Sequence, residues 1–242
     1  WIKNRGGTGD HALHDVIRGA TKRLKSNNTN AEATASEGVQ SFDSDGFTLG
    51  DAGNYNGSSG TYVSWNWLAG GSASSNSNGS ITSSVSVNTT AGFSIVSYAG
   101  YGSNSTVGHG LGSAPKLIII KNRSQSNGWI VGHEELDTSN PWHKYVELHS
   151  TNGVADLNTI WNDTAPTSSV FTLGTEAAVN NSSNNFIAYC FTEKQGYSKF
   201  GKYTGNGNAD GAFSFCGFRP AWIMVKPIDA TQNWQIHATK RP

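Results

Sequence analysis

Hydrophobic residues along this chain fall in short runs or alternate with polar residues. The run KLIIIK at 116–121 is rich in β-branched residues and is flanked by turn residues, as in a strand buried on both faces. In the segment 61–67, Val63, Trp65 and Trp67 share one face of an alternating pattern. Glycine, asparagine and serine clusters separate such runs at short intervals. The pattern predicts an all-β fold, a β-sandwich of the lectin or jelly-roll type.

Other segments refine this prediction. The stretches 92–100 and 211–218 alternate in the same way and are also predicted to be strands. Only residues 14–25 have a helical pattern, and Gly19 interrupts it. Part of that stretch, the basic run RGATKRLK at 18–25, is expected to form an exposed face.

The chain also repeats itself, which indicates tandem structural units. Several identical residues stand 105 positions apart: Pro115 and Pro220, Lys121 and Lys226, Trp129 and Trp234. The opening WIKNR is a third version, with its Lys-Asn-Arg 118 positions before the same triplet at 121–123. The sequence FTLG recurs 124 positions apart, at 47–50 and 171–174. The drift in offset is explained by a longer loop in the second copy.

These offsets predict two tandem β units and a further part. The first unit covers residues 1–107 and carries a Ser/Asn-rich insertion at 70–92. The second unit covers residues 108–212. Residues 213–242 open a third unit or complete the sandwich.

Composition narrows the class of protein. Charged residues make up 14% of the chain, and 17 basic residues balance 17 acidic ones, so we expect no nucleic-acid partner. No apolar run approaches the roughly 18 residues of a membrane span, so no membrane insertion is expected. Cys190 and Cys216 are expected to be small core residues, with a single disulfide between them as the alternative.

The stretch GDHALHD at 9–15 offers two histidines beside two carboxylates. In an extended chain His11 and His14 point to opposite faces and cannot hold one metal ion together. By the repeat offsets, His11 corresponds to Trp129 and Trp234, so its position favours a large flat side chain. We therefore predict no metal site here.

A calcium site is a weaker hypothesis elsewhere. Asp43 and Asp45 form a D-x-D-G turn, and Asp51 lies close enough in sequence to add a ligand. The acid that closes an EF-hand loop is missing, because position 54 is asparagine. The alternative is a polar turn before a strand. Apart from calcium, no cofactor is expected.

No catalytic set can be assembled. The chain has no G-x-S-x-G elbow, and Glu134, Glu135 and Asp137 have no counterpart in the other copies. The aromatic residues remain as candidates for sugar stacking. Trp142 and Trp161 stand in polar segments and have no aromatic counterpart in the first copy, so they are the predicted ligand-binding residues.

As a set, these motifs resemble an uncharacterised domain family of long structural proteins of marine tailed phages. The residues that carry the resemblance include WIKNRGGTGDHALHDVIRGATKRL, SFDSDGFTLG, VGHGLGSAPKLIIIKNR and CGFRPAWIMVK, and it covers nearly the whole chain. It implies a virion component, such as a tail fibre, tail-associated or head-decorating protein, with lectin-like β-sandwich modules. It implies no catalytic residues. The abrupt start within a strand-like segment suggests a fragment of a longer protein.

We therefore expect a non-enzymatic structural module on the virion surface, outside the host cell. Its expected partners are other virion proteins, host-surface glycans and further copies of itself. A polysaccharide-degrading tail enzyme is the first alternative, and a purely architectural spacer is the second.

Overall fold

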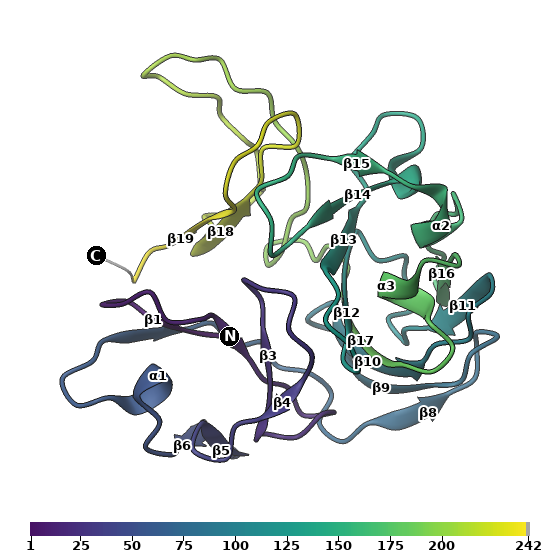
Figure 1. The fold of residues 1–242 in the computed structure, drawn as a ribbon. Helices are drawn as coiled ribbons and strands as arrows, with labels where there is room; N and C mark the ends of the chain where they lie inside the picture. The colour runs from purple at the N-terminus through teal and green to yellow at the C-terminus, as the bar shows by residue number, and fades with distance from the viewer. Residues whose placement is uncertain (241–242) are drawn as a thin grey trace.

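A computed structural model describes residues 1–240 of the chain (Figure 1). Strands dominate this range, so the predicted all-β fold is confirmed. Residues 14–25 do not form a helix, because Gly19 has a φ of +96° and a strand begins at Lys22. The helical elements in the described range are single turns: α1 (Gly53–Asn56), η1 (Pro141–His143), α2 (Asn158–Trp161) and α3 (Ala177–Asn180).

The first sheet is antiparallel and has the strand order β4-β3-β2-β1-β7. Its strands are β1 (Ile2–Asn4), β2 (Ala12–Leu13), β3 (Lys22–Lys25), β4 (Ala33–Thr34) and β7 (Tyr62–Ser64). A separate ribbon of β5 (Val39–Phe42) and β6 (Phe47–Leu49) lies near α1 at the lower left of Figure 1. A small core joins these parts and buries Ile2, Ala12, Val39 and Tyr55.

The second sheet is larger, with the order β15-β14-β13-β12-β17-β10-β9-β8. Its strands are β8 (Ser74–Asn76), β9 (Ser83–Asn88), β10 (Phe93–Ala99), β12 (Leu117–Asn122), β13 (Trp129–His133), β14 (Lys144–Glu147), β15 (Ala155–Asp156) and β17 (Asn185–Phe191). A ribbon of β11 (Ser105–Gly108) and β16 (Val170–Leu173) lies beside it, together with α2 and α3 (Figure 1).

The central strands of this sheet are buried on both faces. In β12, Ile118 and Ile120 point into a core that includes Trp142, Trp161 and the β11–β16 ribbon. Ile119, between them, belongs to a second core on the opposite face. The run at 116–121 is thus the doubly buried strand that its apolar pattern predicts. The second core also takes residues from the first sheet and from the last hairpin, so it holds the three parts of the molecule together.

The two sheets share a pairing scheme. The five strands β15-β14-β13-β12-β17 stand in the same order as β4-β3-β2-β1-β7. The register agrees as well, because Ile2 faces Ala12 in the first sheet and Ile120 faces Ile130 in the second, 118 positions on. The helices α1 and α3 begin 124 positions apart.

The last hairpin follows the same register. It consists of β18 (Trp222–Val225) and β19 (Gln235–Ala238), and Met224 faces Ile236. In the second sheet, Ile119 faces Val131. Each of these residues lies 105 positions before its counterpart in the hairpin. The hairpin therefore has the geometry of β12–β13.

The predicted first unit, residues 1–107, is divided between the two sheets. Residues 2–64 supply the first sheet, whereas β8, β9 and β10 extend the second sheet beyond β17. The predicted insertion at 70–92 holds the whole of β8 and β9, which pair with each other. The predicted boundary at residue 107 therefore does not coincide with the edge of a sheet.

Residues 211–218 do not form the strand that their alternation predicts. They belong to a long loop that projects from the molecule (Figure 1), and Phe213 and Phe215 are 87% and 76% exposed. By the offset of 105 the corresponding region of the second unit is 106–113, which begins inside β11, a strand that pairs with β16. In the described part of the chain, residues 211–218 pair with no strand, so their alternation alone does not produce one.

Candidate functional site

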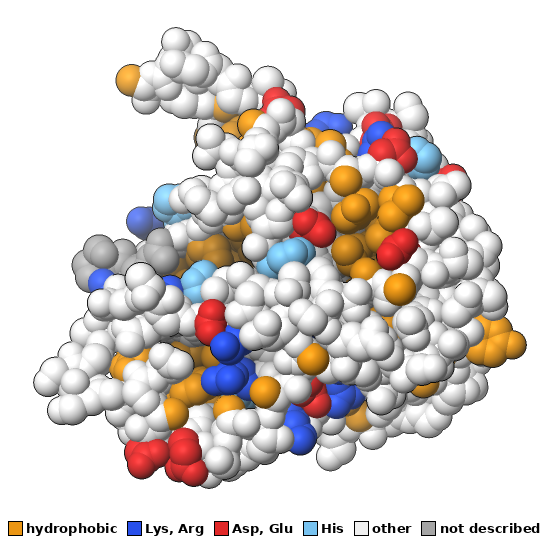
Figure 2. All heavy atoms as spheres, viewed as in Figure 1, with side chains coloured by type: hydrophobic (Ala, Val, Ile, Leu, Met, Phe, Trp, Pro, Cys, Tyr) orange, Lys and Arg blue, Asp and Glu red, His pale blue; other side chains and the backbone are white. Residues whose placement is uncertain are grey.

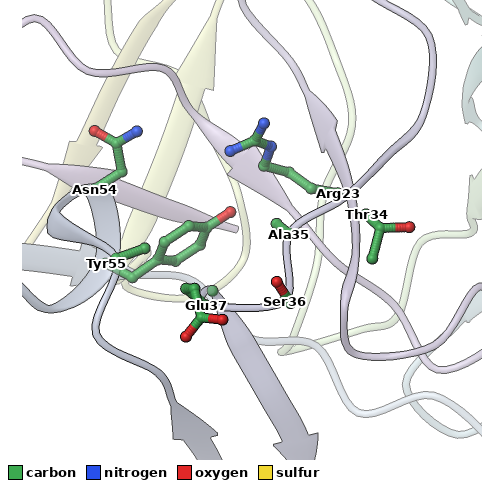
Figure 3. Close-up of a pocket in the computed structure, with 9 residues that line it drawn as sticks. Arg23, Thr34, Ala35, Ser36, Glu37, Asn54 and Tyr55 are labelled. Atoms are coloured by element: carbon green, nitrogen blue, oxygen red, sulfur yellow. The ribbon is translucent and has the colours of Figure 1, made fainter.

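A polar pocket of about 220 Å³ opens in the first unit, beside β3, β4 and α1 (Figure 3). Its lining residues are Arg23, Thr34, Ala35, Ser36, Glu37, Gly38, Ala52, Asn54 and Tyr55. Drug-sized ligands occupy pockets of about 300–1,000 Å³. The size therefore suits a single small group, such as one ring of a larger molecule.

Tyr55 on α1 forms the floor of this pocket. Its ring is buried, and its hydroxyl lies 2.9 Å from Nε2 of His14. Nδ1 of His14 lies 2.7 Å from the carbonyl oxygen of Ala20, so Nδ1 carries the proton and donates it there. Nε2 then accepts from the tyrosine hydroxyl. Burial lowers the pKa of His14 to about 4, which keeps the imidazole neutral and this arrangement intact.

The rim of the pocket carries charge and hydrogen-bonding groups. In Figure 3 the guanidinium of Arg23 and the hydroxyl end of Tyr55 point toward each other across the opening. Burial raises the pKa of Tyr55, and the nearby Arg23 opposes that rise. Nε of Arg23 is buried and has no hydrogen-bond partner among the described residues. Asn54, Ser36 and Glu37 complete an exposed polar rim. A polyhydroxylated or acidic group would find donors and acceptors here.

The two units fill corresponding places differently. The first has small residues where the second has tryptophans, and it has His14 where the second has Gly132. Trp142 and Trp161 lie 122 positions after Ala20 and Val39, the same offset that relates β4 to β15. In the second unit the two indoles meet edge to face, with ring centroids 5.3 Å apart. Gly132 makes room for them, since a Cβ there would stand 2.5 Å from the ring of Trp142.

Trp142 and Trp161, the predicted ligand-binding residues, are therefore core residues. They are 3% and 1% exposed, and both belong to the core that includes Ile118 and Ile120. The prediction was wrong because it rested on the polar residues that surround both tryptophans in the sequence. Neither indole offers a ring face to a ligand in this structure.

The residues of the calcium hypothesis do not form a cluster. Asp43 accepts hydrogen bonds from the hydroxyls of Ser41 and Thr48, both 2.9 Å long, so it stabilises the β5–β6 turn. Asp45 and Asp51 are exposed. Within residues 1–240, no three histidine, cysteine or acidic side chains gather as a metal site would require. The polar-turn interpretation describes Asp43 best.

The cysteines and the acidic residues considered for catalysis have structural surroundings that can be described. Cys190 is buried in the core, as predicted. Cys216 is not a core residue, because it is partly exposed in the loop before β18, and both thiols are free. Glu134 and Glu135 form ion pairs with Lys116 and Lys202. Asp137 accepts hydrogen bonds from the backbone N–H groups of Ser139 and Asn140.

The basic run at 18–25 is not simply an exposed face, because its first residue is buried. Arg18 pairs with Asp15, and the hydroxyl of Tyr189 on β17 donates to the same carboxylate over 2.7 Å. Burial raises the pKa of Asp15, but the charge of Arg18 and its hydrogen bonds outweigh that effect and lower it. The i,i+3 spacing of Asp15 and Arg18 was the only signal in the sequence.

This buried pair extends into a network that joins the units. Arg18 also contacts Glu32, and Arg123 at the end of β12 binds the two carboxylate oxygens of Glu32 over 2.9 and 3.0 Å. The network is a structural feature rather than a reactive site, because every charge in it is paired.

The comparisons with known proteins place the chain in a family. All of residues 1–242 match the family described as a domain of unknown function, DUF7483. The chain belongs to this family. No curated protein and no solved structure matches the chain. In the described range, no helix has the length and hydrophobicity needed to cross a bilayer.

Proposed function

We propose that this chain is a non-enzymatic structural module of a phage virion. It contributes to host attachment by holding one sugar of a surface polysaccharide in the pocket of the first unit. The virion setting rests on the sequence resemblance described above. The ligand proposal rests on the pocket at Arg23 and Tyr55, so the two parts can be tested separately.

The observation that carries the ligand proposal is the set of hydrogen-bonding groups around an open pocket of about 220 Å³ in the first unit. The guanidinium of Arg23, the amide of Asn54 and the hydroxyl of Ser36 are groups that bind sugar hydroxyls or a sugar carboxylate.

Binding without cleavage fits the acids at this site. Glu37 is the one carboxylate among the described residues that line the pocket. Glycoside hydrolysis by the usual routes requires two carboxyl groups about 5–9.5 Å apart. The surface is also suited to an extracellular scaffold. On the face in Figure 2, charged side chains of both signs form small scattered groups in a largely uncharged surface.

The test is binding of the purified chain to polysaccharides extracted from the surfaces of marine bacteria. Arg23→Gln is expected to weaken binding at least about tenfold, because a charged hydrogen bond to a ligand contributes about 1.5–3 kcal/mol. Arg219→Gln is the matched control, since Arg219 is exposed and lies outside the pocket. Binding is expected to persist in chelator, and no new reducing ends are expected.

Each other result contradicts a stated part of the proposal. Equal binding by Arg23→Gln and by the native chain would remove the pocket as the site. Release of reducing ends would establish the enzyme alternative. Absence of binding to every polysaccharide in the panel would favour the architectural spacer. Loss of binding in chelator would restore the calcium hypothesis at Asp43 and Asp45.

A further inference from the structure

A second cavity, of about 210 Å³, lies where the three parts of the molecule meet. Trp1 and His11 of the first unit line one side, and Met224 and Trp234 of the last hairpin line another. The segment after β14 contributes His149 and its neighbours. Residues of all three parts meet here. The contacts between these parts therefore indicate which segment could bind in the cavity.

The second unit docks on the first through two side chains. Nε1 of Trp129 donates to the carbonyl oxygen of Lys25 at the end of β3, over 2.8 Å. Nζ of Lys121 donates to the carbonyl oxygen of Thr29, a few residues later, over 3.1 Å. Leu24, the central apolar residue of β3, is fully buried in the shared core.

The last hairpin docks on the second unit in the same way. Nε1 of Trp234 donates to the carbonyl oxygen of Glu147 at the end of β14, over 2.8 Å. Nζ of Lys226 donates to the carbonyl oxygen of Thr151, over 2.9 Å. The donors lie 105 positions after Trp129 and Lys121, and the acceptors lie 122 positions after Lys25 and Thr29. Val146 is buried in the place that corresponds to Leu24.

The first unit carries the same docking face. Lys3 and His11 correspond to Lys121 and Trp129 by the offset of 118, and Trp1 corresponds to Ile119. Lys3 binds the carbonyl oxygens of Gly7 and Gly9 in its own hairpin. The ring of His11 has no hydrogen bond to another described residue and faces the second cavity. At the two formed junctions this face covers a strand, β3 or β14.

We propose that the second cavity is a docking site for one more strand of the β3 and β14 type, which belongs to the third unit. The strand would lie between the β18–β19 hairpin and the face made by Trp1 and His11. It would place an aliphatic side chain in the shared core, and its carbonyl oxygen would accept a hydrogen bond from His11. Three units would then close around one common core. This inference is independent of the proposed polysaccharide pocket.

The test supplies such a strand. A chain extended after Pro242 by a copy of residues 138–151, which contain β14, presents the strand at a high effective concentration. Amide hydrogen exchange in β19 is expected to slow at least about tenfold relative to the native chain. Acrylamide quenching of tryptophan fluorescence is expected to fall. Both changes are expected to shrink when the extended chain also carries His11→Ala.

The control is an identical extension in which the copied strand carries Val146→Asp. An aspartate cannot enter the apolar core, so this extension is expected to leave exchange in β19 unchanged. Equal protection by the two extensions, or protection by neither, would overturn the proposal. Sedimentation of the native chain as a dimer with β19 already protected would also overturn it, because a second copy would then occupy the cavity.

Discussion

The buried ion pair of Asp15 and Arg18 has a third partner, Tyr189, that the local sequence does not reveal. The pair is buried beneath Tyr189, which comes from the other sheet. Removal of one charge from such a pair leaves the other uncompensated in a medium of low polarity. These residues therefore stabilise the contact between the first unit and the second sheet.

Asp15→Ala is expected to lower the free energy of unfolding by about 3–5 kcal/mol, the range for breaking one side of a buried ion pair. Urea denaturation measures this change. Asp45→Ala is the control, because Asp45 is exposed, and is expected to stay within about 0.5 kcal/mol of the native chain. Equal, small effects of the two substitutions would show that the pair contributes nothing.

His14 makes stability depend on pH in a definite direction. Its pKa is about 4 in the folded chain, against 6.5 when unperturbed. Between these values the unfolded chain binds a proton at His14 and the folded chain does not, so stability falls as the pH drops from 6.5 to 4. The contribution is on the order of 3 kcal/mol. His14→Gln is expected to flatten the curve of stability against pH in this window, and an unchanged slope would contradict this interpretation.

The doubly buried strand β12 illustrates what local patterns can predict. Its β-branched run indicates burial on both faces. The alternation around Trp65 and Trp67 predicts more strand than forms, because β7 ends at Ser64 and both indoles follow it. The burial of β12 on both faces follows from its local sequence alone. The burial of Trp142 and Trp161 could not be predicted so easily, because it depends on the absence of a side chain at Gly132 in another strand.

Pairing between distant strands was likewise beyond the local pattern. The strand β10 pairs with β17, almost a hundred residues later, and so draws residues of the predicted first unit into the second sheet. The polar pocket was missed for a related reason. Arg23 comes from β3, whereas Asn54 and Tyr55 come from α1, and neither segment alone signals a site.

The substitution Trp142→Ala tests whether Trp142 is a core residue or a ligand-binding residue. It is expected to cost about 3–5 kcal/mol in unfolding free energy, as for other large aromatic residues removed from a core. Polysaccharide binding by the folded variant is expected to be unchanged, since Trp142 lies outside the pocket at Arg23. Loss of binding with retained stability would return Trp142 to the role that the sequence pattern predicts for it.

The docking lysines give a matched pair of substitutions. Lys121 is fully buried and donates to the carbonyl oxygens of Thr29, Asn122 and Gln125, whereas Lys226 is only partly buried. Lys121→Met leaves buried acceptors unsatisfied and is expected to cost about 2–3 kcal/mol. Lys226→Met is expected to cost less. Thermal unfolding of the two variants measures the difference, and the reverse order would contradict the assignment of Lys121 to the formed junction.

The molecule as a whole consists of similar β units that dock through corresponding residues around a shared core. Such an arrangement holds loops and pockets rigidly, and units can differ where they meet a ligand without a change of scaffold. The first unit has an open polar pocket, the second has a filled interior, and a long loop with exposed Phe213 and Phe215 precedes the last hairpin.

The most direct measurement is a chemical-shift map of the isotope-labelled chain during titration with a surface polysaccharide that it binds. The account predicts shifts at Arg23, Ser36 and Asn54, with the indole signals of Trp142 and Trp161 unmoved. Shifts confined to the loop around Phe213, or to the buried indoles, would contradict it.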